Sequence, residues 1–424
     1  MSKSPMNDDA WKNVYFHEVC DVNPTYKIAD GEICSFIDMA SVAEDSPQPR
    51  NIEIREYKKT SASKFRNGDV LFARITPCTE NGKTALVQGL TTEFGFGSTE
   101  FIVLSPKDEL DSKFLYYMVK DGNVRNKAIA RMVGTTGRQR VPNEFFRDEL
   151  EVSLPPLFQQ RKVAAILTSV DDAIDATQRV IDQTEVVKRG LMQQLLTRGV
   201  GHTKFKQTEI GEIPAEWGVV RLSSVSNLIT KGTTPTTYGF NYCENGINFI
   251  KVESIDEHGN FHEDKFAKIS TDAHAKLSRS QIQEGDILFS IAGALGRAAV
   301  ATSNILPANT NQALAIIRLS KGNLDVRFVF YTLLSSIVQH QIKMISTAGA
   351  QPNLSLKQVG DFFIPMPHVE EQLKIVKIIS AIDARIANEK QYLSSLVIFK
   401  QGLMQVLLTG NVRVNVDEPS EVSV

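Results

Sequence analysis

The sequence has few cysteines, little net charge and no long apolar run, and each scarcity excludes a class of protein. The four cysteines, Cys20, Cys34, Cys78 and Cys243, are too widely spaced for a metal knuckle or a CxxC redox pair, so we expect reduced thiols. No stretch approaches the roughly 18 apolar residues of a membrane span, and the start MSKSPMNDDAWK is polar. A cytoplasmic protein without a membrane partner is expected. The net charge of -2 neither demands nor excludes nucleic acid.

Recognisable catalytic motifs are also lacking. The seven histidines show no HExxH pairing. The GKT at Gly82 is similar to the end of a phosphate-binding P-loop, but the first glycine of that motif would fall at Pro77. The stretch Asn23-Pro24-Thr25-Tyr26 resembles the Asn-Pro-Pro-Tyr loop of amino-methyltransferases, but its second proline is missing. The sequence therefore contains no catalytic constellation, cofactor motif or metal-ligand pattern that we can assign.

What the sequence does contain is an internal repeat. The stretch KRGLMQQLLT, which begins at Lys188, returns as KQGLMQVLLT at Lys400. Sliding the chain by 212 residues aligns 154–200 with 366–412 without a gap, and 15 of those 47 positions are identical. Chance does not produce such a match, so this segment is written twice.

Each copy of the repeat predicts a long helix. Prolines in the opening stretches LEVSLPP and FFIPMPH forbid an incoming helix and suit the start of a new one. Alternating steps of four and three residues from Val163 to Leu195, and from Ile375 to Leu407, fall mostly on apolar residues, which is a heptad seam. A helix of about 60 Å needs a partner, and its own duplicate is the obvious one. The alternative is two unrelated amphipathic helices, each packed on its own domain.

The segments before the helices repeat more faintly. Trp11 and Trp217 open the two halves, GDVLFARI at Gly68 corresponds to GDILFSIA at Gly285, and each is followed by a glycine-basic stretch, GKTAL or GRAAV. These predict a turn, a buried strand, a loop and a second strand in each half. The expected division is a first domain at 1–153, a spacer helix at 154–198, a linker at 199–214, a second domain at 215–365, a second spacer helix at 366–410 and a disordered tail at 411–424.

Basic residues cluster locally despite the neutral balance. From Gly122 to Asn143 the chain carries five cations and no acid. The second half is milder, with Arg327, Lys343 and Lys357 between Asp325 and Asp361. Such a run is either a solvated helix face or a phosphate-binding surface, and both interpretations stay open.

Taken together, two globular halves that each precede a segment of the form LPPLFQQRKVAAIL…KRGLMQQLLT, with IGEIPAEW before the second half, resemble the specificity subunit of a type I restriction-modification system. The resemblance implies a mixed α/β (α+β) fold with two target recognition domains, two long antiparallel coiled-coil helices and a pseudo-twofold repeat. It also implies double-stranded DNA as ligand, two modification subunits that use S-adenosylmethionine, and restriction subunits that use ATP and magnesium. The chain itself would then be a non-catalytic subunit that holds no cofactor or metal. The first half lacks the IPAEW lead-in, so its N-terminal edge is expected to differ.

Two sets of site residues follow. The basic and loop residues expected at DNA are Arg74, Lys83, Arg125, Lys127, Arg131, Arg138, Gln139, Arg140, Arg297, Lys343, Gln351 and Asn353. The repeated signature expected at the two partners is Lys188, Gly190, Leu191, Met192, Leu195 and Leu196, with Lys400, Gly402, Leu403, Met404, Leu407 and Leu408. The rival functions are a DNA methyltransferase in its own right and a coiled-coil adaptor without a DNA role.

Overall fold

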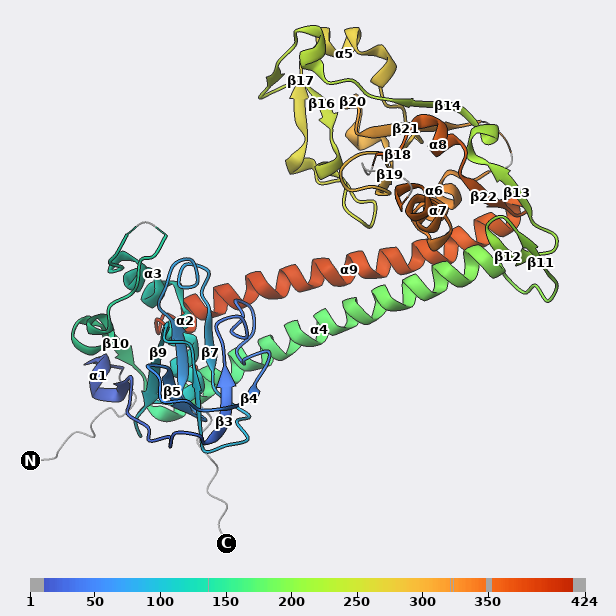
Figure 1. Cartoon of the computed structure of the whole chain (residues 1–424). Helices are drawn as coiled ribbons and strands as arrows, with labels where there is room; N and C mark the ends of the chain where they lie inside the picture. Colours follow the sequence, from blue (N-terminus) through green and yellow to red (C-terminus); the bar gives the residue numbers. More distant parts are fainter. Residues whose placement is uncertain (1–10, 136, 321, 323, 348–352, 415–424) are drawn as a thin grey trace, which may run out of the picture. The chain divides into compact units, whose positions relative to one another are not determined.

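A computed structural model describes residues 11–135, 137–320, 322, 324–347 and 353–414 (Figure 1). The chain divides into two units, one formed by Met1–Val180 with Glu389–Val424 and the other by Ile181–Asn388. Two long helices, α4 (Leu157–Arg198) and α9 (Val369–Leu407), contribute to both units. Each unit therefore combines one globular domain with part of each helix.

The first unit holds the first globular domain. Its strands are β1 (Lys12–Tyr15), β2 (Cys20–Val22), β3 (Ile33–Ile37), β4 (Glu53–Glu56), β5 (Ser63–Arg66), β6 (Val70–Ala73), β7 (Thr84–Leu86), β8 (Phe94–Gly97), β9 (Phe101–Pro106) and β10 (Glu151–Leu154), and its helices are α1 (Phe16–Val19), α2 (Ser112–Lys120) and α3 (Gly122–Ala130). They form two four-stranded sheets, in the orders β2-β9-β6-β7 and β4-β3-β8-β5. A separate antiparallel pair, β1 with β10, leads into α4.

Strand β6 is the buried strand expected from the sequence, and it lies between two hydrophobic cores of this domain. Its residues alternate between two cores because successive side chains of a strand point to opposite faces. Val70 and Phe72 pack in a cluster that includes residues of α2, α4 and α9, whereas Leu71 packs in a second cluster with Phe65 of the other sheet. The domain is thus fastened to the long helices through one face of its main sheet.

The second unit repeats this plan. Its strands are β11 (Phe205–Thr208), β12 (Gly211–Pro214), β13 (Gly218–Arg221), β14 (Ser226–Lys231), β15 (Tyr242–Cys243), β16 (Ile247–Ile250), β17 (Ala267–Ile269), β18 (Ile287–Ser290), β19 (Ala298–Val300), β20 (Ala308–Thr310), β21 (Leu314–Leu319) and β22 (Phe363–Met366), and its helices are α5 (Thr271–Lys276), α6 (Val326–Leu334), α7 (Ser336–Thr347) and α8 (Leu356–Gly360). The sheet β14-β21-β18-β19 matches β2-β9-β6-β7, and the pair β13–β22 matches β1–β10. The two halves therefore share the topology of the main sheet and of this strand pair, as the faint sequence repeat predicted. The second sheets, β4-β3-β8-β5 and β15-β17-β16-β20, differ in their fourth strand, because β5 pairs with β8 whereas β15 pairs with β17.

The long helices run antiparallel. In the first unit, Val163 and Leu167 of α4 share a core with Met404 and Leu407 near the end of α9. In the second unit, residues at the end of α4 share a core with Ile375 and Ile379 near the start of α9. Every position of the predicted seam is buried or half-buried, so the paired-helix interpretation is confirmed over two unrelated amphipathic helices.

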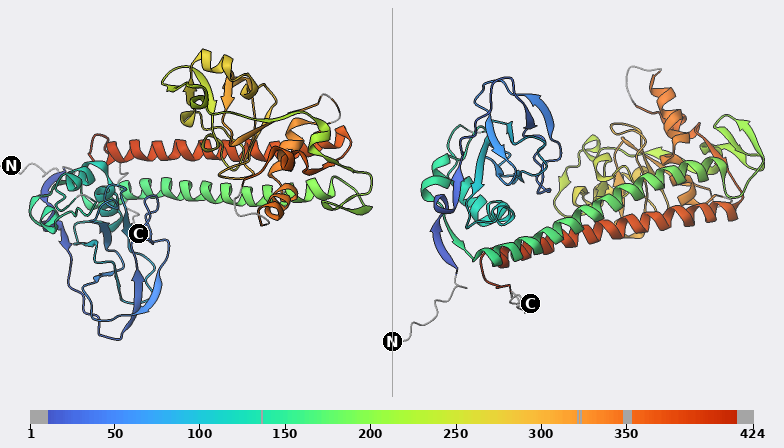
Figure 2. Two further views of the ribbon diagram at one scale, coloured as in Figure 1. Left: turned by 45° about the horizontal axis from the view of Figure 1, so that its top comes forward. Right: turned by 90° about the horizontal axis from the view of Figure 1, so that it is seen from below.

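Several segment boundaries differ from those expected. The helices begin three residues later than 154 and 366, because β10 and β22 occupy the residues before the prolines. The expected linker at 199–214 contains an antiparallel hairpin, β11 with β12, next to the end of α4 (Figure 2). Of the expected tail, Val414 packs against the core of the first unit, and residues 415–424 lie outside the described part of the chain.

The two tryptophans occupy matching places at the helix starts. Trp11 Nε1 donates a hydrogen bond to Gln159 Oε1 of α4 at 3.2 Å, and Trp217 Nε1 donates to Glu371 Oε2 of α9 at 2.9 Å. Trp217 also covers Gly199, where an added Cβ would lie 2.6 Å from its ring. A tryptophan therefore ties the beginning of each globular domain to the helix that follows it.

Candidate nucleic-acid interface

The basic segment after α3 forms a small hairpin in the first unit. Val133 and Arg140 pair in an isolated antiparallel bridge, with N–H to O distances of 3.0 and 2.9 Å in the two directions. Gly137 at the tip has φ of +80°, a left-handed conformation that glycine adopts without strain. Gln139 accepts a hydrogen bond from Thr76 N through its carbonyl, so the hairpin is anchored to the loop after β6. Arg138 is left exposed beside this tip.

Although this segment contains no acidic residue, carboxylates from other parts of the sequence lie beside its arginines. Arg140 Nε and Nη2 donate to the carboxylate of Glu100, with distances of 2.7 to 3.1 Å, and Arg131 Nη2 lies 2.5 Å from Glu149 Oε1. Hydrogen bonds from Arg140 lower the pKa of Glu100, which keeps this carboxylate charged. Because Glu100 already occupies the guanidinium fork of Arg140, this residue is a weaker candidate for reading guanine than Arg138.

Arg74 lies at the edge of a cavity that the sequence did not indicate. The cavity has a volume of about 350 Å³. Its polar lining includes Thr25, Tyr26, Ser61, Ser63, Lys64, Arg74 and Thr99. Arg74 Nη1 donates to Asn143 Oδ1 at 3.2 Å, while its Nε is buried without a hydrogen-bond partner among the described residues. Thr25 and Tyr26 belong to the stretch Asn23-Pro24-Thr25-Tyr26, which the sequence indicated only as an incomplete methyltransferase loop. The remaining polar lining residues, Ser61, Ser63, Lys64 and Thr99, were missed because they lie in segments with no periodic or repeated signal.

Other predicted cations have structural contacts. Lys83 Nζ donates to Met39 O at 3.1 Å, and Arg297 Nη1 donates to Ile255 O at 2.9 Å. Arg125 packs over Gly82, where an added Cβ would lie 2.3 Å from its Nη1. The GKT turn is thus a close approach between two segments and not a phosphate loop. Lys127, in contrast, is exposed on α3.

The second unit brings together less of its predicted set. Leu354 N donates to Ile291 O at 2.9 Å, as Val141 N does to Arg74 O at 2.8 Å, so both units hold this loop to the strand end in the same way. Asn353 is exposed next to this bond, and Lys343 is exposed on α7. Gln351 lies outside the described residues.

The repeated signature on the long helices mostly faces inward. Lys188 and Lys400 are buried, with 8% and 9% of their surface exposed, and each forms an ion pair inside its own unit. Buried or half-buried apolar members account for most of the rest, namely Leu191, Met192, Leu195, Leu196, Leu403, Met404, Leu407 and Leu408, while Gly190 and Gly402 are exposed. The identity of these residues between the copies therefore has an intramolecular explanation.

Exposed apolar side chains stand immediately before each buried lysine. Val186 and Val187 on α4 are 58% and 54% exposed, and their counterparts Ile398 and Phe399 on α9 are 69% and 56% exposed. These four residues are called the paired apolar patches. They were missed because their residue types differ between the copies, so a search for identities passes over them.

The described residues contain neither a candidate membrane span nor a candidate metal site. Within the described residues no helix combines the length and apolar character needed to cross a membrane. In the same part of the chain no three His, Cys, Asp or Glu side chains converge as metal ligands would.

A duplicated mixed α/β domain with basic loops, mounted on paired antiparallel helices, defines a DNA-recognition subunit. A family model described as the type I restriction modification DNA specificity domain matches residues 8–186 and 214–396. The chain therefore belongs to the specificity subunits of type I restriction-modification systems, which are non-catalytic and act on DNA together with other subunits of such a system.

Individual relatives agree with this assignment. The chain is 30% identical over 370 residues to a putative type I restriction enzyme MjaX specificity subunit of Methanocaldococcus jannaschii, covering 85% of this chain and 83% of the relative. It is 27% identical to the MjaVIII specificity subunit of the same organism, covering 76% and 75%. A solved structure from work on complex assembly and conformational transition of a type I R-M system has the same fold, with a TM-score of 0.62 at 20% identity, covering 97% of this chain and all of that one.

Proposed function

We propose that each recognition domain reads one segment of a bipartite DNA site. The observation that carries this proposal is the repetition of one main sheet with divergent loops at the same place. The segments after α3 and α7 are tied to the ends of β6 and β18 by similar main-chain bonds, from Val141 N to Arg74 O and from Leu354 N to Ile291 O. The exposed residues beside these bonds differ, with Arg138 in one unit and Asn353 in the other. Arginine suits guanine and asparagine suits adenine, so the same scaffold would read different sequences.

In the first unit, the exposed Arg138 and Lys127 and the cavity beside Arg74 form the proposed DNA-binding surface. Lys64 lines the same cavity, but its Nζ donates to Tyr26 O at 3.2 Å, so it is engaged within the protein as Lys83 is. The exposed cations would supply contacts to phosphates, and the cavity would add the hydroxyls of Thr25, Ser61 and Thr99. The hydroxyls of Tyr26 and Ser63 already donate to Asp69 and to Phe101 O.

Five other predicted cations are proposed to hold the loops that carry this surface, because each is engaged within the protein or packed against its main chain. They are Arg140, Arg131, Lys83, Arg125 and Arg297. Gln139 in the first unit and Lys343 in the second unit remain candidates for contact with the DNA backbone.

We further propose that the paired apolar patches dock two identical modification subunits. Val187 and Phe399 occupy equivalent positions of the repeat, so each copy would offer one apolar patch to one partner. Exposed Gly190 and Gly402, one turn further along each helix, would allow close approach of a partner helix there. The buried apolar residues of the repeated signature would pack inside the helix pair and hold these patches in position.

The partner chemistry completes the proposal. The modification subunits would bind S-adenosylmethionine and methylate adenine, and restriction subunits with ATP and magnesium would add DNA cleavage. This chain would supply DNA recognition and the frame. If it were a methyltransferase itself, calorimetry on the purified chain would show binding of S-adenosylmethionine, which we do not expect.

A domain exchange tests the bipartite assignment. Residues 11–150 are replaced by the corresponding domain of a relative that recognises another site, and methylated adenines are mapped across a genome after co-expression with the modification subunit. One half of the methylated site should change while the other half stays. A change in both halves would contradict the modular assignment, and weak DNA affinity of the complete complex would favour the adaptor without a DNA role.

A further inference from the structure

A buried three-residue cluster joins the first recognition domain to both long helices. Tyr117 of α2 donates its hydroxyl hydrogen bond to Asp171 Oδ2 of α4 at 2.7 Å. Lys400 of α9 contacts the other oxygen of the same carboxylate. Tyr117, Asp171 and Lys400 are respectively 1%, 3% and 9% exposed. Burial, reinforced by the charge of Asp171, raises the pKa of Tyr117, so its hydroxyl remains a donor.

The second unit contains the same cluster with the helices exchanged. Tyr331 of α6 donates to Asp383 Oδ2 of α9 at 2.7 Å, and Lys188 Nζ of α4 lies 2.5 Å from Asp383 Oδ1. Burial raises the pKa of Tyr331 to about 12, so this hydroxyl is also protonated at neutral pH. Asp171 and Lys188 are 17 positions apart on α4, and Asp383 and Lys400 are likewise 17 positions apart on α9. One antiparallel register therefore satisfies both ion pairs.

The apolar seam does not distinguish this register from its neighbours. A heptad seam repeats every seven residues, so apolar positions meet again after a slip of one heptad, which is about 10 Å along the helix. The same slip would move Lys188 about 10 Å from Asp383, and Lys400 equally far from Asp171. Each unit would then hold charges away from their partners in a largely apolar seam, which is strongly unfavourable.

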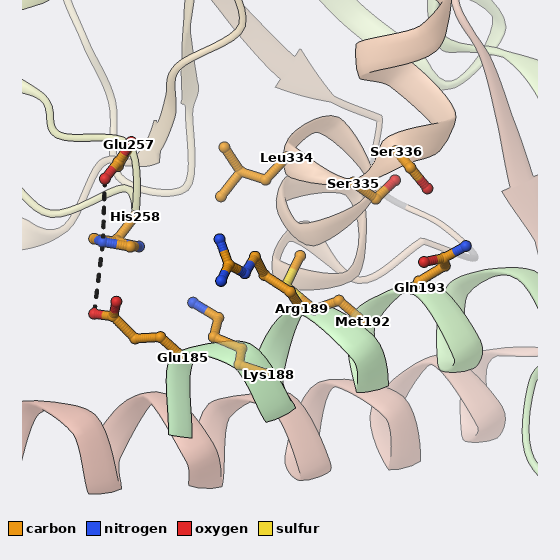
Figure 3. A pocket seen from close by; sticks show the side chains of 10 residues that line it. All are labelled: Glu185, Lys188, Arg189, Met192, Gln193, Glu257, His258, Leu334, Ser335 and Ser336. Carbon is orange, nitrogen blue, oxygen red and sulfur yellow. Dashed lines mark ion pairs between the residues drawn. The ribbon is translucent and has the colours of Figure 1, made fainter. Parts of the chain in front are cut away.

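The two clusters differ in how open they are. The Asp383 side chain is 35% exposed, and Lys188 lines a cavity of about 400 Å³ with Arg189, His258 and Ser335 (Figure 3). In the first unit Lys120 stands at the α2 position that Leu334 occupies in α6, and its Nζ donates to Glu44 O at 2.8 Å. The second pair is therefore the one that tolerates substitution more easily.

We propose that the two Lys–Asp pairs, each completed by a tyrosine of a recognition domain, are positioning residues that select one register of α4 against α9. The complex is thereby limited to one spacing between its two half-sites. The inference rests on the proposed function, because it assumes that the chain reads a bipartite site. Buried polar pairs that fix the register of paired helices are a known use of such groups.

The test removes both charges of a pair together, which leaves no unpaired buried charge. One variant carries Lys188→Met with Asp383→Asn, and a second adds Lys400→Met with Asp171→Asn. Each is co-expressed with the modification subunit, and methylated sites are mapped across a genome. Sites with the native half-sites about three base pairs nearer or farther apart should become about tenfold more frequent, a change that corresponds to about 1.4 kcal/mol in register preference.

The matched control is Asp172→Asn with Arg189→Met, which removes one acid and one base from exposed positions beside the clusters. It should keep the native spacing. If the four-substitution variant does not fold, the pairs serve stability at that site, and the two-substitution variant at the more open pair decides the outcome. A folded two-substitution variant confined to the native spacing overturns the inference, and relaxed spacing supports it.

The unchanged complex, mapped in parallel, separates this inference from the proposed function. If that complex methylates no two-part site, the proposed function fails and the register inference falls with it. If it methylates a two-part site and the variants keep its spacing, only the register inference fails.

Discussion

Lengthening both long helices at facing positions should move the two half-sites apart. Gln183 lies five residues before Lys188 on α4, and Asn388 lies five residues after Asp383 on α9, so the ion pair places these two residues opposite each other. Duplicating residues 180–183 and 384–387 therefore inserts four residues at the same level in both helices. Ile181 and Ile386 are each repeated at a spacing of four, which continues the apolar seam with a local unwinding of the supercoil.

The size of the shift follows from helix geometry. Four residues add about 6 Å at 1.5 Å per residue, which is slightly less than two base pairs at roughly 3.4 Å per pair. Each added base pair also rotates the second half-site about the DNA axis, because B-DNA turns once in about 10 base pairs. We expect methylation of the same half-sites with one or two additional base pairs between them.

Genome-wide mapping of methylated adenine measures this spacing directly. The control inserts residues 180–183 a second time in α4 alone, which sets apolar positions of one helix against polar positions of the other. That protein should lose stability, seen as a lower Tm, without acquiring a new spacing. A folded, active double insertion with the native spacing would refute the idea that the helices measure DNA.

Three further predictions concern single sites. Val187→Asp or Phe399→Asp alone should reduce the number of bound modification subunits from two to one, and the two substitutions together should reduce it to none, as counted by native mass spectrometry. The control is Ala165→Asp, at an exposed position outside the patches. Two bound subunits in both single variants would exclude these patches as docking sites. If Arg138 reads a base, Arg138→Ala should weaken binding to the specific site by about 1 to 3 kcal/mol. If Arg138 contacts a phosphate, the substitution should lower affinity for all sequences and flatten the salt dependence. Unchanged binding at both low and high salt would remove Arg138 from the interface. Burial lowers the pKa of Lys120 from 10.5 to about 8, so the unfolded chain binds more protons between these values and stability due to Lys120 rises with pH across that window. The Tm of the native chain minus that of Lys120→Met should therefore increase from pH 8 to pH 10, and parallel curves would contradict the assigned burial.

The sequence alone determined the plan of the molecule, because the signals involved are periodic or repeated. The 212-residue shift exposed the duplication, and the four-and-three spacing from Val163 to Leu195 predicted a paired helix. Glycine-aspartate turns before β6 and β18 marked the central strands, since Asp69 and Asp286 each accept a main-chain hydrogen bond within the turn. Such patterns can be recognised without knowing which segments of the chain are in contact.

Only the tertiary structure decided which side chains are available for function. Identity between the copies marked Lys188 and Lys400 as equivalent but could not say that both point inward to aspartates on the other helix. Glu100 lies 40 residues before Arg140 in the sequence, so only the pairing of distant segments shows that this arginine is already engaged. The repeat likewise relates Gln183 to Ser395, whereas the antiparallel register places Gln183 opposite Asn388. A repeat records equivalence under a rotation, and contact across that rotation depends on direction and register, which are set by long-range packing and by buried charge.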